Sequence, residues 1–457
     1  MRRRHLSELA GAVEGTVRGE DVIVSAAVVD SRAAGSDALF VAVHGQLRDG
    51  HAFVSDAFAN GSPAAMIDEP WPALSSPEGA LLVVGDTEEG LLRLATDERG
   101  AMSAKVVAVT GANGKTSTKD LAAAVLGSRF RTHASPASFN NEVGVPLTIL
   151  GAPADTEVLI CELGARRVGD HLRLCAVVSP DVVVVTNAGV AHMEIFGSWS
   201  SIVEATAEPI EVLEPAHTAV LNADDAVVAG LAARTRARVM TFGTIASADV
   251  RAEDVSLTPD GRPAFTLAMG GDREPVELAV HGEHMVPNAL AAAACGLALG
   301  MSVAECATGL KGAGVSHWRM ETFTTSGGVT VVNDAYNANP DSMAAGLRTA
   351  RWIARGTRLI AVLGHMAELG PIALEEHERI GELLARIGVE RLVAVGPEAE
   401  PIARAAVREG LEPDAVTVAA TVNEALAGLR GAVRSGDVVF LKGSRVAGLE
   451  RIAEAMR

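Results

Sequence analysis

The segment from Lys105 to Gly127 combines the residue types of a phosphate-binding loop. KVVAVTG is typical of a buried strand, TSTKDLAAAVLG of a helix, and the glycine turn GANGK joins the two. Small residues in such a turn let backbone N–H groups approach phosphate oxygens, and the start of the helix adds a favourable dipole. We expect Lys115 to neutralise the terminal phosphates of a nucleotide and the Thr116 hydroxyl to reach a Mg²⁺ ion. The loop departs from the general pattern at Val109, where a glycine is usual.

A glycine turn with an incidental lysine is the alternative interpretation of this segment. The strand–turn–helix context favours the phosphate site, because that context is what such a loop requires. The predicted nucleotide contacts of the loop are Gly111, Asn113, Gly114, Lys115, Thr116 and Ser117.

Two further polar residues follow apolar runs later in the chain. Glu162 ends the run VLICE, and His192 comes shortly after VVVVTN. Open α/β sheets bind ligands at the carboxyl ends of their strands, and a glutamate there suits a hard Mg²⁺ ion. Alone, either residue is more typical of a helix cap or of the surface. Their order after a phosphate loop favours a shared site.

The elements that must position these residues fall into three blocks. Short apolar runs alternate with helical pieces in each block, and the glycine-rich turn KGAGVSHWRME (311–321) separates the second block from the third. Near-continuous apolar strands that alternate with helices indicate parallel sheets buried on both faces. We predict an α/β protein of three domains, at residues 1–103, 104–318 and 319–457.

The composition supports this organisation and excludes several functions. The 457 residues are 48% hydrophobic and only 3% aromatic, a mix that suits helices packed on parallel strands. The net charge of -18 argues against nucleic-acid binding. The four cysteines lack paired spacing, which disfavours disulfides and zinc sites. No signal peptide and no apolar run of about 18 residues is present, so we expect a cytoplasmic protein without membrane insertion.

Motifs in all three predicted domains strengthen the nucleotide interpretation. After TGANGKTSTK (110–119) come SFNNEVGVPLTIL (138–150), ELGAR (162–166), NAGVAHMEIFGS (187–198), HMVPNALAAAA (284–294), HWRME (317–321), NDAYNANPDSM (333–343), LGHMAELG (363–370) and KGSRVAGLE (442–450), while DSR (30–32), LFVA (39–42) and DGH (49–51) precede it. In this order the motifs resemble the Mur ligase family over nearly the whole chain. The resemblance implies a central P-loop ATPase domain with a parallel sheet, between a small N-terminal α/β domain that binds a UDP-linked substrate and a C-terminal Rossmann-like ligase domain.

The resemblance implies an ATP-dependent peptide ligase that uses Mg²⁺. The carboxylate of a UDP-N-acetylmuramoyl-tripeptide would attack the γ-phosphorus of ATP, and the amine of D-alanyl-D-alanine would then displace phosphate from the acyl phosphate. Two alternatives stay open: a ligase on the same scaffold for another peptide or amino acid, and a weakly active homologue that binds nucleotide or UDP-muramyl peptide. A monomer that closes around its substrates is our default. The third residue of the tripeptide, diaminopimelate or lysine, stays open.

For the central domain, the resemblance implies roles for four polar residues outside the loop. His192 would approach a second metal ion, Asn140 and Asn141 would orient the acyl-phosphate region, and Asn288 would contact adenine. Turn formation is the alternative for the first two asparagines, and a helix cap for Asn288. The implied metal ligands are Thr116, Glu162 and His192, and the implied catalytic residues are Lys115, Asn140, His192 and Arg319.

The third domain is expected to complete the nucleotide site. Arg319 suits the developing phosphate charge, and Asp334 suits the ribose hydroxyls. Tyr336 is the only tyrosine of the chain, and its motif favours a site or lid over the core. Asn337 and Asn339 are expected beside it as substrate-binding groups.

Two donor clusters are implied for the ends of the substrates. Lys442, Ser444 and Arg445 follow the run DVVFL and would hold a peptide carboxylate; a solvated charge patch is the alternative.

Ser31 and Arg32 of the first domain would face the uridine diphosphate, next to the DGH motif (Asp49, Gly50 and His51). A local salt bridge between Asp30 and Arg32 is the alternative there.

One position departs from the family pattern. Members commonly carry a lysine that reacts with carbon dioxide to give a metal-binding carbamate, and Thr206 stands at that position. No lysine occurs between Lys119 and Lys311. Either Glu204 or Glu208 supplies the missing charge, or the second metal binds weakly; we expect a ligase without carbon-dioxide activation. His365 stands where an acidic residue is frequent, and we assign it no role.

Overall fold

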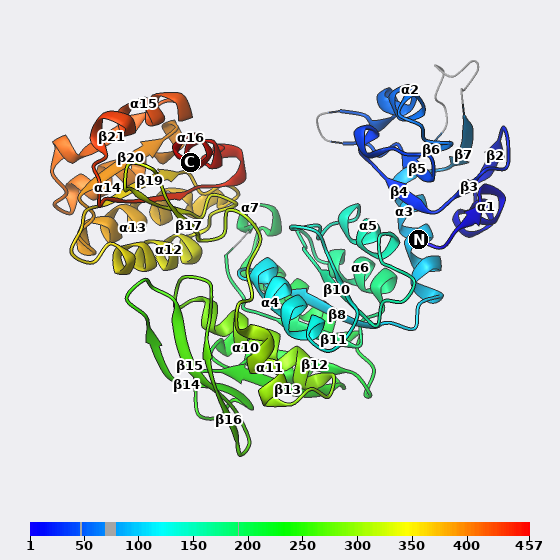
Figure 1. Cartoon of the computed structure of the whole chain (residues 1–457), viewed down its shortest axis with the longest axis horizontal. Helices are drawn as coiled ribbons and strands as arrows, with labels where there is room; N and C mark the ends of the chain where they lie inside the picture. The colour runs from blue at the N-terminus through cyan, green and yellow to red at the C-terminus, as the bar shows by residue number, and fades with distance from the viewer. Residues whose placement is uncertain (46–47, 69–78, 191) are drawn as a thin grey trace.

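The computed structural model describes residues 1–45, 48–68, 79–190 and 192–457. Among the described residues, three large sheets with covering helices and one small two-stranded sheet are present, and Figure 1 shows the large central sheet between the N-terminal and C-terminal ones. The two outer sheets lie apart from each other, each beside its own side of the central domain (Figure 1). This architecture confirms the predicted three-domain α/β fold.

The N-terminal sheet has five strands in the order β2-β7-β6-β5-β4. The four strands from β4 to β7 run parallel, and β2 pairs antiparallel with β7. These strands are β2 (Thr16–Arg18), β4 (Ala26–Val28), β5 (Ala38–Val41), β6 (Ala64–Asp68) and β7 (Ala80–Val84); β1 (Arg4–His5) and β3 (Ile23–Val24) form a separate pair, and the helices are α1 (Leu6–Val13), α2 (Val54–Ala59) and α3 (Thr87–Gly100). Helix α3 packs this sheet onto the central domain, because it also contacts α5 and α6.

The central sheet has nine strands in the order β16-β15-β14-β13-β12-β11-β8-β10-β9. Its strands are β8 (Lys105–Thr110), β9 (Thr132–Ala134), β10 (Val158–Glu162), β11 (Val182–Val185), β12 (Thr218–Asn222), β13 (Arg238–Gly243), β14 (Val250–Leu257), β15 (Pro263–Met269) and β16 (Asp272–Glu277). Neighbouring strands run parallel from β9 through β10, β8, β11, β12 and β13 to β14. Strand β15 pairs antiparallel with both β14 and β16. The sequence predicts a parallel sheet here, and the antiparallel part formed by β14, β15 and β16 was not predicted.

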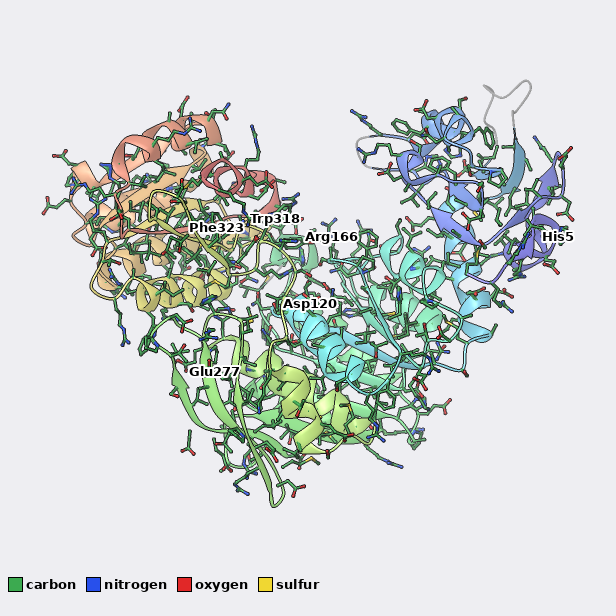
Figure 2. The ribbon with its side chains drawn as sticks, in the orientation of Figure 1. His5, Asp120, Arg166, Glu277, Trp318 and Phe323 are labelled. Carbon is green, nitrogen blue, oxygen red and sulfur yellow. The ribbon has the colours of Figure 1, made fainter. Side chains whose placement is uncertain are left out.

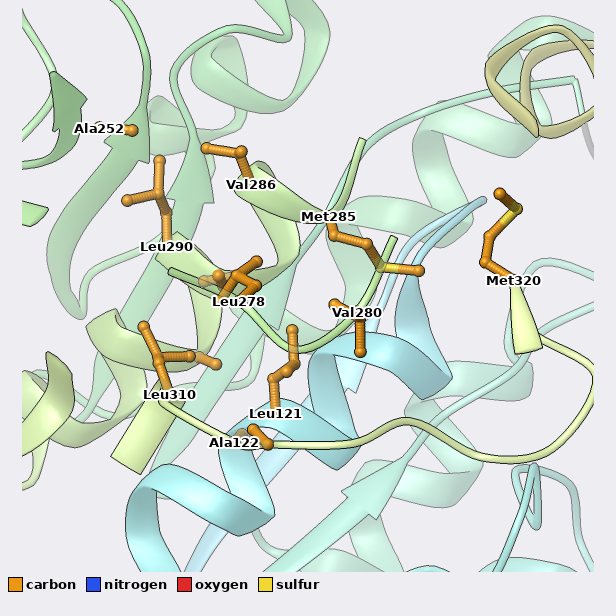
Figure 3. Packing of buried hydrophobic residues seen from close by; sticks show 14 of the residues in the cluster. Leu121, Ala122, Ala252, Leu278, Val280, Met285, Val286, Leu290, Leu310 and Met320 are labelled. Atoms are coloured by element: carbon orange, nitrogen blue, oxygen red, sulfur yellow. The ribbon is translucent and has the colours of Figure 1, made fainter. Parts of the chain in front are cut away.

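The α-helices described in this part of the chain are α4 (Lys115–Gly127), α5 (Gly144–Leu150), α6 (Asp170–Val178), α7 (Met193–Phe196), α8 (Trp199–Glu211) and α9 (Ala226–Gly230), which lie between the strands, and α10 (Met285–Ala298) and α11 (Val303–Leu310), which follow β16. Helices α4 and α10 pack against each other, and Figure 3 shows Leu121 and Ala122 of α4 near Val280 and Met285. This apolar contact fixes the helix that begins at the phosphate loop.

The C-terminal sheet has six strands in the order β17-β18-β22-β19-β20-β21. All pairs are parallel except β17 with β18. The strands are β17 (Glu321–Thr324), β18 (Thr330–Asn333), β19 (Leu359–Gly364), β20 (Arg391–Val395), β21 (Val416–Ala419) and β22 (Val438–Lys442); the helices are α12 (Pro340–Ile353), α13 (Ala373–Arg386), α14 (Glu400–Arg408), α15 (Val422–Ala432) and α16 (Glu450–Met456).

The connections between sheets lie close to the predicted boundaries at 103 and 318. Residues 101–104 join α3 to β8, and residues 311–320 join α11 to β17. The second connection is tied to α4, because Asp120 Oδ2 accepts hydrogen bonds of 2.7 Å from both the backbone N–H and the hydroxyl of Ser316. The boundaries themselves stay predictions.

All four cysteines are buried and free of disulfides. Among the residues that the structure describes, we find no helix with the length and apolarity needed to cross a bilayer.

Candidate active site

The phosphate loop follows the central strand β8, between β10 and β11, and its geometry requires glycine. Gly111 has φ +128°, and a Cβ there would come within 2.1 Å of Thr186 Oγ1. Gly114 has φ +79°, and its Cβ would lie 2.3 Å from Asn288 Oδ1. Both glycines therefore permit a close approach as well as an unusual backbone. Val109 is a buried strand residue, so its side chain belongs to the core.

Lys115 is the first residue of α4, and its side chain folds back onto the phosphate loop. Its Nζ donates to the carbonyls of Gly111 at 2.6 Å and Ala112 at 3.2 Å. Desolvation holds the pKa of the ammonium below its ordinary value, and Glu162 offsets this only in part. A phosphate anion at the loop would supply the missing counter-charge.

Oxygen-bearing side chains gather around the carboxylate of Glu162 at the end of β10. Thr116 Oγ1 donates to Glu162 Oε2 at 2.7 Å, and Ser138 Oγ donates to Glu162 Oε1 at 2.9 Å. Asn140 Nδ2 also donates to Oε1, at 2.7 Å. Thr116 and Glu162 are 2% and 1% exposed. A hydroxyl and a carboxylate in contact at a phosphate loop are the donor types that Mg²⁺ prefers, so these residues fit the ion.

Sequence reasoning missed two residues of this cluster. Ser138 opens the motif SFNNE, and its position in that motif was the available signal. Lys119 is buried on α4, where its Nζ donates to the carbonyls of Ser135 at 2.8 Å and Ala137 at 2.9 Å. These bonds hold the loop that presents Ser138 and Asn140.

Arg319 reaches this cluster from the C-terminal side of the molecule. Its Nη2 donates to Thr116 Oγ1 at 2.7 Å, and its guanidinium carbon lies 4.2 Å from the centre of the Tyr336 ring. The Nε of Arg319 is buried and finds no partner among the described residues. An unpaired donor beside the phosphate loop fits an anionic ligand.

A second contact across the domains involves the turn itself. Asn339 Nδ2 donates to Asn113 Oδ1 at 2.5 Å, and Asn339 Oδ1 caps α12 by accepting from Ser342 N at 3.0 Å. Asn113 is also tied to the segment that follows β11, because its N–H donates to Asn187 Oδ1 at 2.8 Å. The predicted phosphate contact Asn113 therefore also joins two domains.

Three residues predicted to bind ligands contact each other in the C-terminal domain. Lys442 Nζ donates to Asp334 Oδ2 at 2.5 Å and to the carbonyl of Asn337 at 3.0 Å. Met320 N donates to Asp334 Oδ1 at 3.2 Å. Lys442 is buried, so its ammonium braces the ribose candidate Asp334.

Ser444 and Arg445 also have partners within the protein. Ser444 is buried, and its hydroxyl accepts from Ala367 N at 2.6 Å. The Arg445 guanidinium lies 4.5 Å from the Trp318 ring centre and pairs with Glu450 Oε1 at 3.0 Å. Binding of a peptide carboxylate by this cluster stays a prediction.

Two asparagines differ in what their side chains contact. Asn141 Oδ1 accepts from Gly144 N at 2.9 Å at the start of α5, which is the turn role weighed against substrate binding. Asn288 is inside α10, whose N-cap is His284, so it does not cap the helix. Its Oδ1 instead accepts a long hydrogen bond of 3.4 Å from Thr118 and lies against Gly114. Asn288 is therefore placed beside the nucleotide loop.

His192 begins α7 in a left-handed conformation, with φ 58°. Its Nδ1 pairs with a carboxylate oxygen of Glu368 from the C-terminal domain. Burial lowers the pKa of the imidazole, and Glu368 opposes that shift. The neutral ring that burial favours is the form that binds metals.

The residues of the predicted uridine site contact other residues of the N-terminal domain. The Arg32 guanidinium pairs with Asp30 at 2.7 Å and is 87% exposed, so the salt bridge weighed as the alternative is present. The same carboxylate accepts from Arg32 N within the turn that contains Ser31. His51 is buried, and its Nδ1 pairs with Asp49 Oδ1 at 2.7 Å. Figure 1 places this domain away from the C-terminal one.

The region of Thr206 holds two glutamates, Glu204 and Glu208, that differ in their contacts. Thr206 Oγ1 donates to the Ile202 carbonyl at 2.7 Å within α8. Glu204 is bonded to Arg234 at 2.9 and 3.0 Å on the surface. Glu208 Oε1 accepts from Gly169 N at 2.5 Å at the start of α6. Glu204 is therefore engaged on the surface, whereas Glu208 Oε2 is buried without a hydrogen-bond partner among the described residues, so replacement of the carbamate by Glu208 stays a prediction.

A cavity of about 610 Å³ opens beside Thr116 where the domains meet. Its walls include Ser316, Trp318, Arg319, Tyr336 and Arg457. Figure 2 shows Trp318 and Arg166 on facing parts of the two domains, above Asp120 of α4. The volume is in the range of small-molecule sites.

Comparisons with known proteins extend over the same elements. Residues 109–296 match the Mur ligase middle domain, and residues 318–445 match the Mur ligase, glutamate ligase domain. The chain is 39% identical to the UDP-N-acetylmuramoyl-tripeptide–D-alanyl-D-alanine ligase of Mycobacterium tuberculosis, covering 99% of this chain and 96% of that protein.

Solved structures of MurF proteins superpose on this chain over nearly its whole length. A crystal structure of MurF from Acinetobacter baumannii superposes with a TM-score of 0.86 at 30% identity, covering 100% of this chain and 99% of the other. MurF ligase from Thermotoga maritima, solved in complex with ADP, superposes with a TM-score of 0.80 at 28% identity, covering 95% and 97%. The likeness therefore spans all three domains.

Proposed function

The chain belongs to the Mur ligase family, and we infer that it joins D-alanyl-D-alanine to UDP-N-acetylmuramoyl-tripeptide in peptidoglycan precursor synthesis. It is an ATP-dependent ligase of the class that forms peptide bonds between acids and amino acids. One observation carries the proposal: the phosphate-loop hydroxyl of Thr116 contacts Glu162 of its own domain and Arg319 of the next. A site of this kind can hold a phosphate tail while two domains present the reacting groups.

The residues around Thr116 support phosphoryl transfer to a carboxylate. The carboxylate oxygen of the tripeptide attacks the γ-phosphorus of ATP, ADP leaves, and an acyl phosphate forms. The amine of D-alanyl-D-alanine then attacks the acyl carbon, and phosphate leaves. Lys115 and Arg319 stabilise the negative charge that collects on the transferred group.

Thr116, Glu162 and His192 are the residues that would hold Mg²⁺. The ion, when bound, neutralises charge on the phosphate oxygens. Asn140 positions the carboxylate of Glu162 through the bond at 2.7 Å. Closure of the domains over the site would keep water away from the acyl phosphate. We propose that the enzyme works as a cytoplasmic monomer.

Phosphate release tests the proposal directly. Purified protein is mixed with ATP, Mg²⁺, UDP-N-acetylmuramoyl-tripeptide and D-alanyl-D-alanine, and each component is left out in turn. We expect release only in the complete mixture, together with a product whose mass equals the two substrates less one water. Absence of both signals would reject the ligase assignment.

A substrate panel separates this function from its alternatives. Tripeptides that end in diaminopimelate or in lysine, and other dipeptides and amino acids as acceptors, are compared by kcat/KM. A preference for another acceptor would indicate a ligase for a different peptide. Nucleotide binding without turnover on any pair would indicate the weakly active homologue.

A further inference from the structure

Glu368 of the C-terminal domain meets His192 of the central domain, although the two residues lie 176 positions apart. The loop 365–370 that carries Glu368 follows β19 and precedes η4 (Gly370–Ile372). Helix α7, which His192 caps, contacts η4 and lies next to the C-terminal domain in Figure 1. The pair therefore lies on the boundary that must close around the substrates.

The chemistry of the pair fixes which imidazole nitrogen is free. A carboxylate oxygen can only accept, so the hydrogen on the imidazole is on Nδ1. The Nε2 lone pair is then available, and no hydrogen bond to it occurs among the described residues. Metal-binding histidines usually have this arrangement, with one nitrogen on the ion and the other donating to a carboxylate.

The loop that carries Glu368 is braced on both sides. Ser444 accepts from Ala367 N at 2.6 Å, and Ser444 N donates to the carbonyl of His365 at 3.0 Å. His377 Nε2 accepts from Met366 N at 2.8 Å. These bonds give the buried Ser444 of the KGSR motif, and the unassigned His365, a role in shaping this loop.

The opposite side of the loop that carries Glu368 packs against α7. Glu194 N donates to the carbonyl of Glu368 at 3.2 Å. Gly370 has φ +56°, and a Cβ there would lie 3.1 Å from Cα of Glu194. Glu368 itself has φ 61°, a conformation rare for a residue with a side chain. Close packing thus holds the carboxylate toward His192, and Arg166 Nη2 lies 3.5 Å from its other oxygen.

We propose that Glu368 is a positioning residue: it orients His192 so that Nε2 faces the metal at the nucleotide, and it thereby makes metal binding depend on docking of the C-terminal domain. The proposal rests on the function inferred above, in which His192 binds Mg²⁺. The alternative explanation is that this ion pair only stabilises the contact between the domains. The two explanations predict different metal affinities when Glu368 is substituted.

Metal binding without turnover distinguishes them. Mn²⁺ is titrated by electron paramagnetic resonance into protein saturated with a non-hydrolysable ATP analogue, so no acceptor substrate is needed. For Glu368→Ala we expect Mn²⁺ affinity to fall about 10- to 100-fold, as for other carboxylates behind metal-binding histidines. Glu368→Gln, whose amide oxygen still accepts from Nδ1, should recover most of that loss.

Arg166→Gln is the matched control, because it removes the other charge of the same interdomain contact and leaves Glu368 on His192. We expect its Mn²⁺ affinity to stay within about threefold of wild type. A fall as large as that of Glu368→Ala would mean that docking alone matters, and unchanged affinity in Glu368→Ala would overturn the proposal.

The imidazole itself provides a second readout. Nitrogen-15 spectra of the histidines, with the His192 signal assigned through His192→Gln, should show the Nδ1–H tautomer in wild type and a mixture in Glu368→Ala. The same mixture in both proteins would contradict the orienting role. Because neither measurement uses the tripeptide or the dipeptide, failure of the ligase assignment would show separately, in phosphate release by the wild type.

Discussion

Several polar groups of the central site have partners in another domain, whereas those of the N-terminal site have theirs within their own domain. Thr116 is joined to Arg319, Asn113 to Asn339, and His192 to Glu368. In the N-terminal domain, Arg32 pairs with Asp30 and His51 with Asp49. The first site therefore depends on how the domains are arranged, and the second is complete within one domain.

This difference matches the tasks that the two sites would have. A site that holds only one end of a substrate has no need to change during the reaction. A site that transfers a phosphoryl group must bring several charged groups together and exclude water. We therefore expect substitutions at the domain boundary to lower kcat and those in the N-terminal domain to raise KM.

The largest effect is expected for Lys115→Ala. Lys115 sits at the phosphate loop without an anionic hydrogen-bond partner, so its charge is free for ATP. Removing it should lower phosphate release about 1,000-fold, as for loss of a main electrostatic group. Lys105→Ala, on the exposed start of the same β8 strand, is the matched control and should behave like wild type. Residual activity above about a tenth would contradict a phosphate-binding role.

A smaller loss is expected for Arg319→Lys. Lysine keeps the charge but loses the planar group that lies over Tyr336 and bonds Thr116. We predict about a 100-fold fall in kcat, with adenine nucleotide affinity, measured by calorimetry, changed far less. Arg355→Lys removes a comparable stack on Trp352, 3.7 Å from its ring centre, and serves as the control. Equal losses in both variants would point to stability instead of catalysis.

The same comparison explains what could be predicted from the sequence. The phosphate loop is contiguous, so Gly111, Gly114 and Lys115 could be identified from the strand, glycine turn and helix in which they lie. Several parallel strands are apolar runs, such as VVVV at 182–185, and this local pattern predicts them. Strand β14 instead mixes apolar and charged residues, is buried only at Val250 and Ala252, and was missed.

Contacts between domains cannot be predicted from a local sequence pattern. Nothing near Glu368 in the sequence indicates His192, and nothing near Lys442 indicates Asp334, because the fold brings each pair together. The motifs did mark these residues as a group. Their partners, and therefore whether a residue braces the site or meets the ligand, depend on tertiary structure.

A weaker effect, on binding alone, is expected for Arg32→Ala. The Arg32 guanidinium is exposed and held by Asp30, ready to meet an anionic substrate group. Its loss should raise KM for the UDP-linked tripeptide about tenfold and leave kcat unchanged, because such a contact is equal in ground and transition states. Steady-state kinetics measure both, with the exposed Arg3→Ala as control. A fall in kcat would mean that the two sites are coupled more closely than their contacts indicate.

The smallest effect, and the only gain, is expected for Thr206→Lys. The Thr206 hydroxyl donates to the Ile202 carbonyl of its own helix, Glu204 pairs with Arg234, and Glu208 Oε1 accepts from Gly169 N, so Thr206 itself supplies no metal-binding charge. A lysine that reacts with carbon dioxide would add a carboxylate near the second metal, and we predict a rise in activity of about two- to tenfold that requires bicarbonate. Phosphate release is measured for both proteins with and without bicarbonate, and Thr206→Gln, which cannot form the carbamate, is the control. A strong response of the wild type to bicarbonate would show that the protein has another route to activation, and the central site would then depend on carbon dioxide despite the threonine.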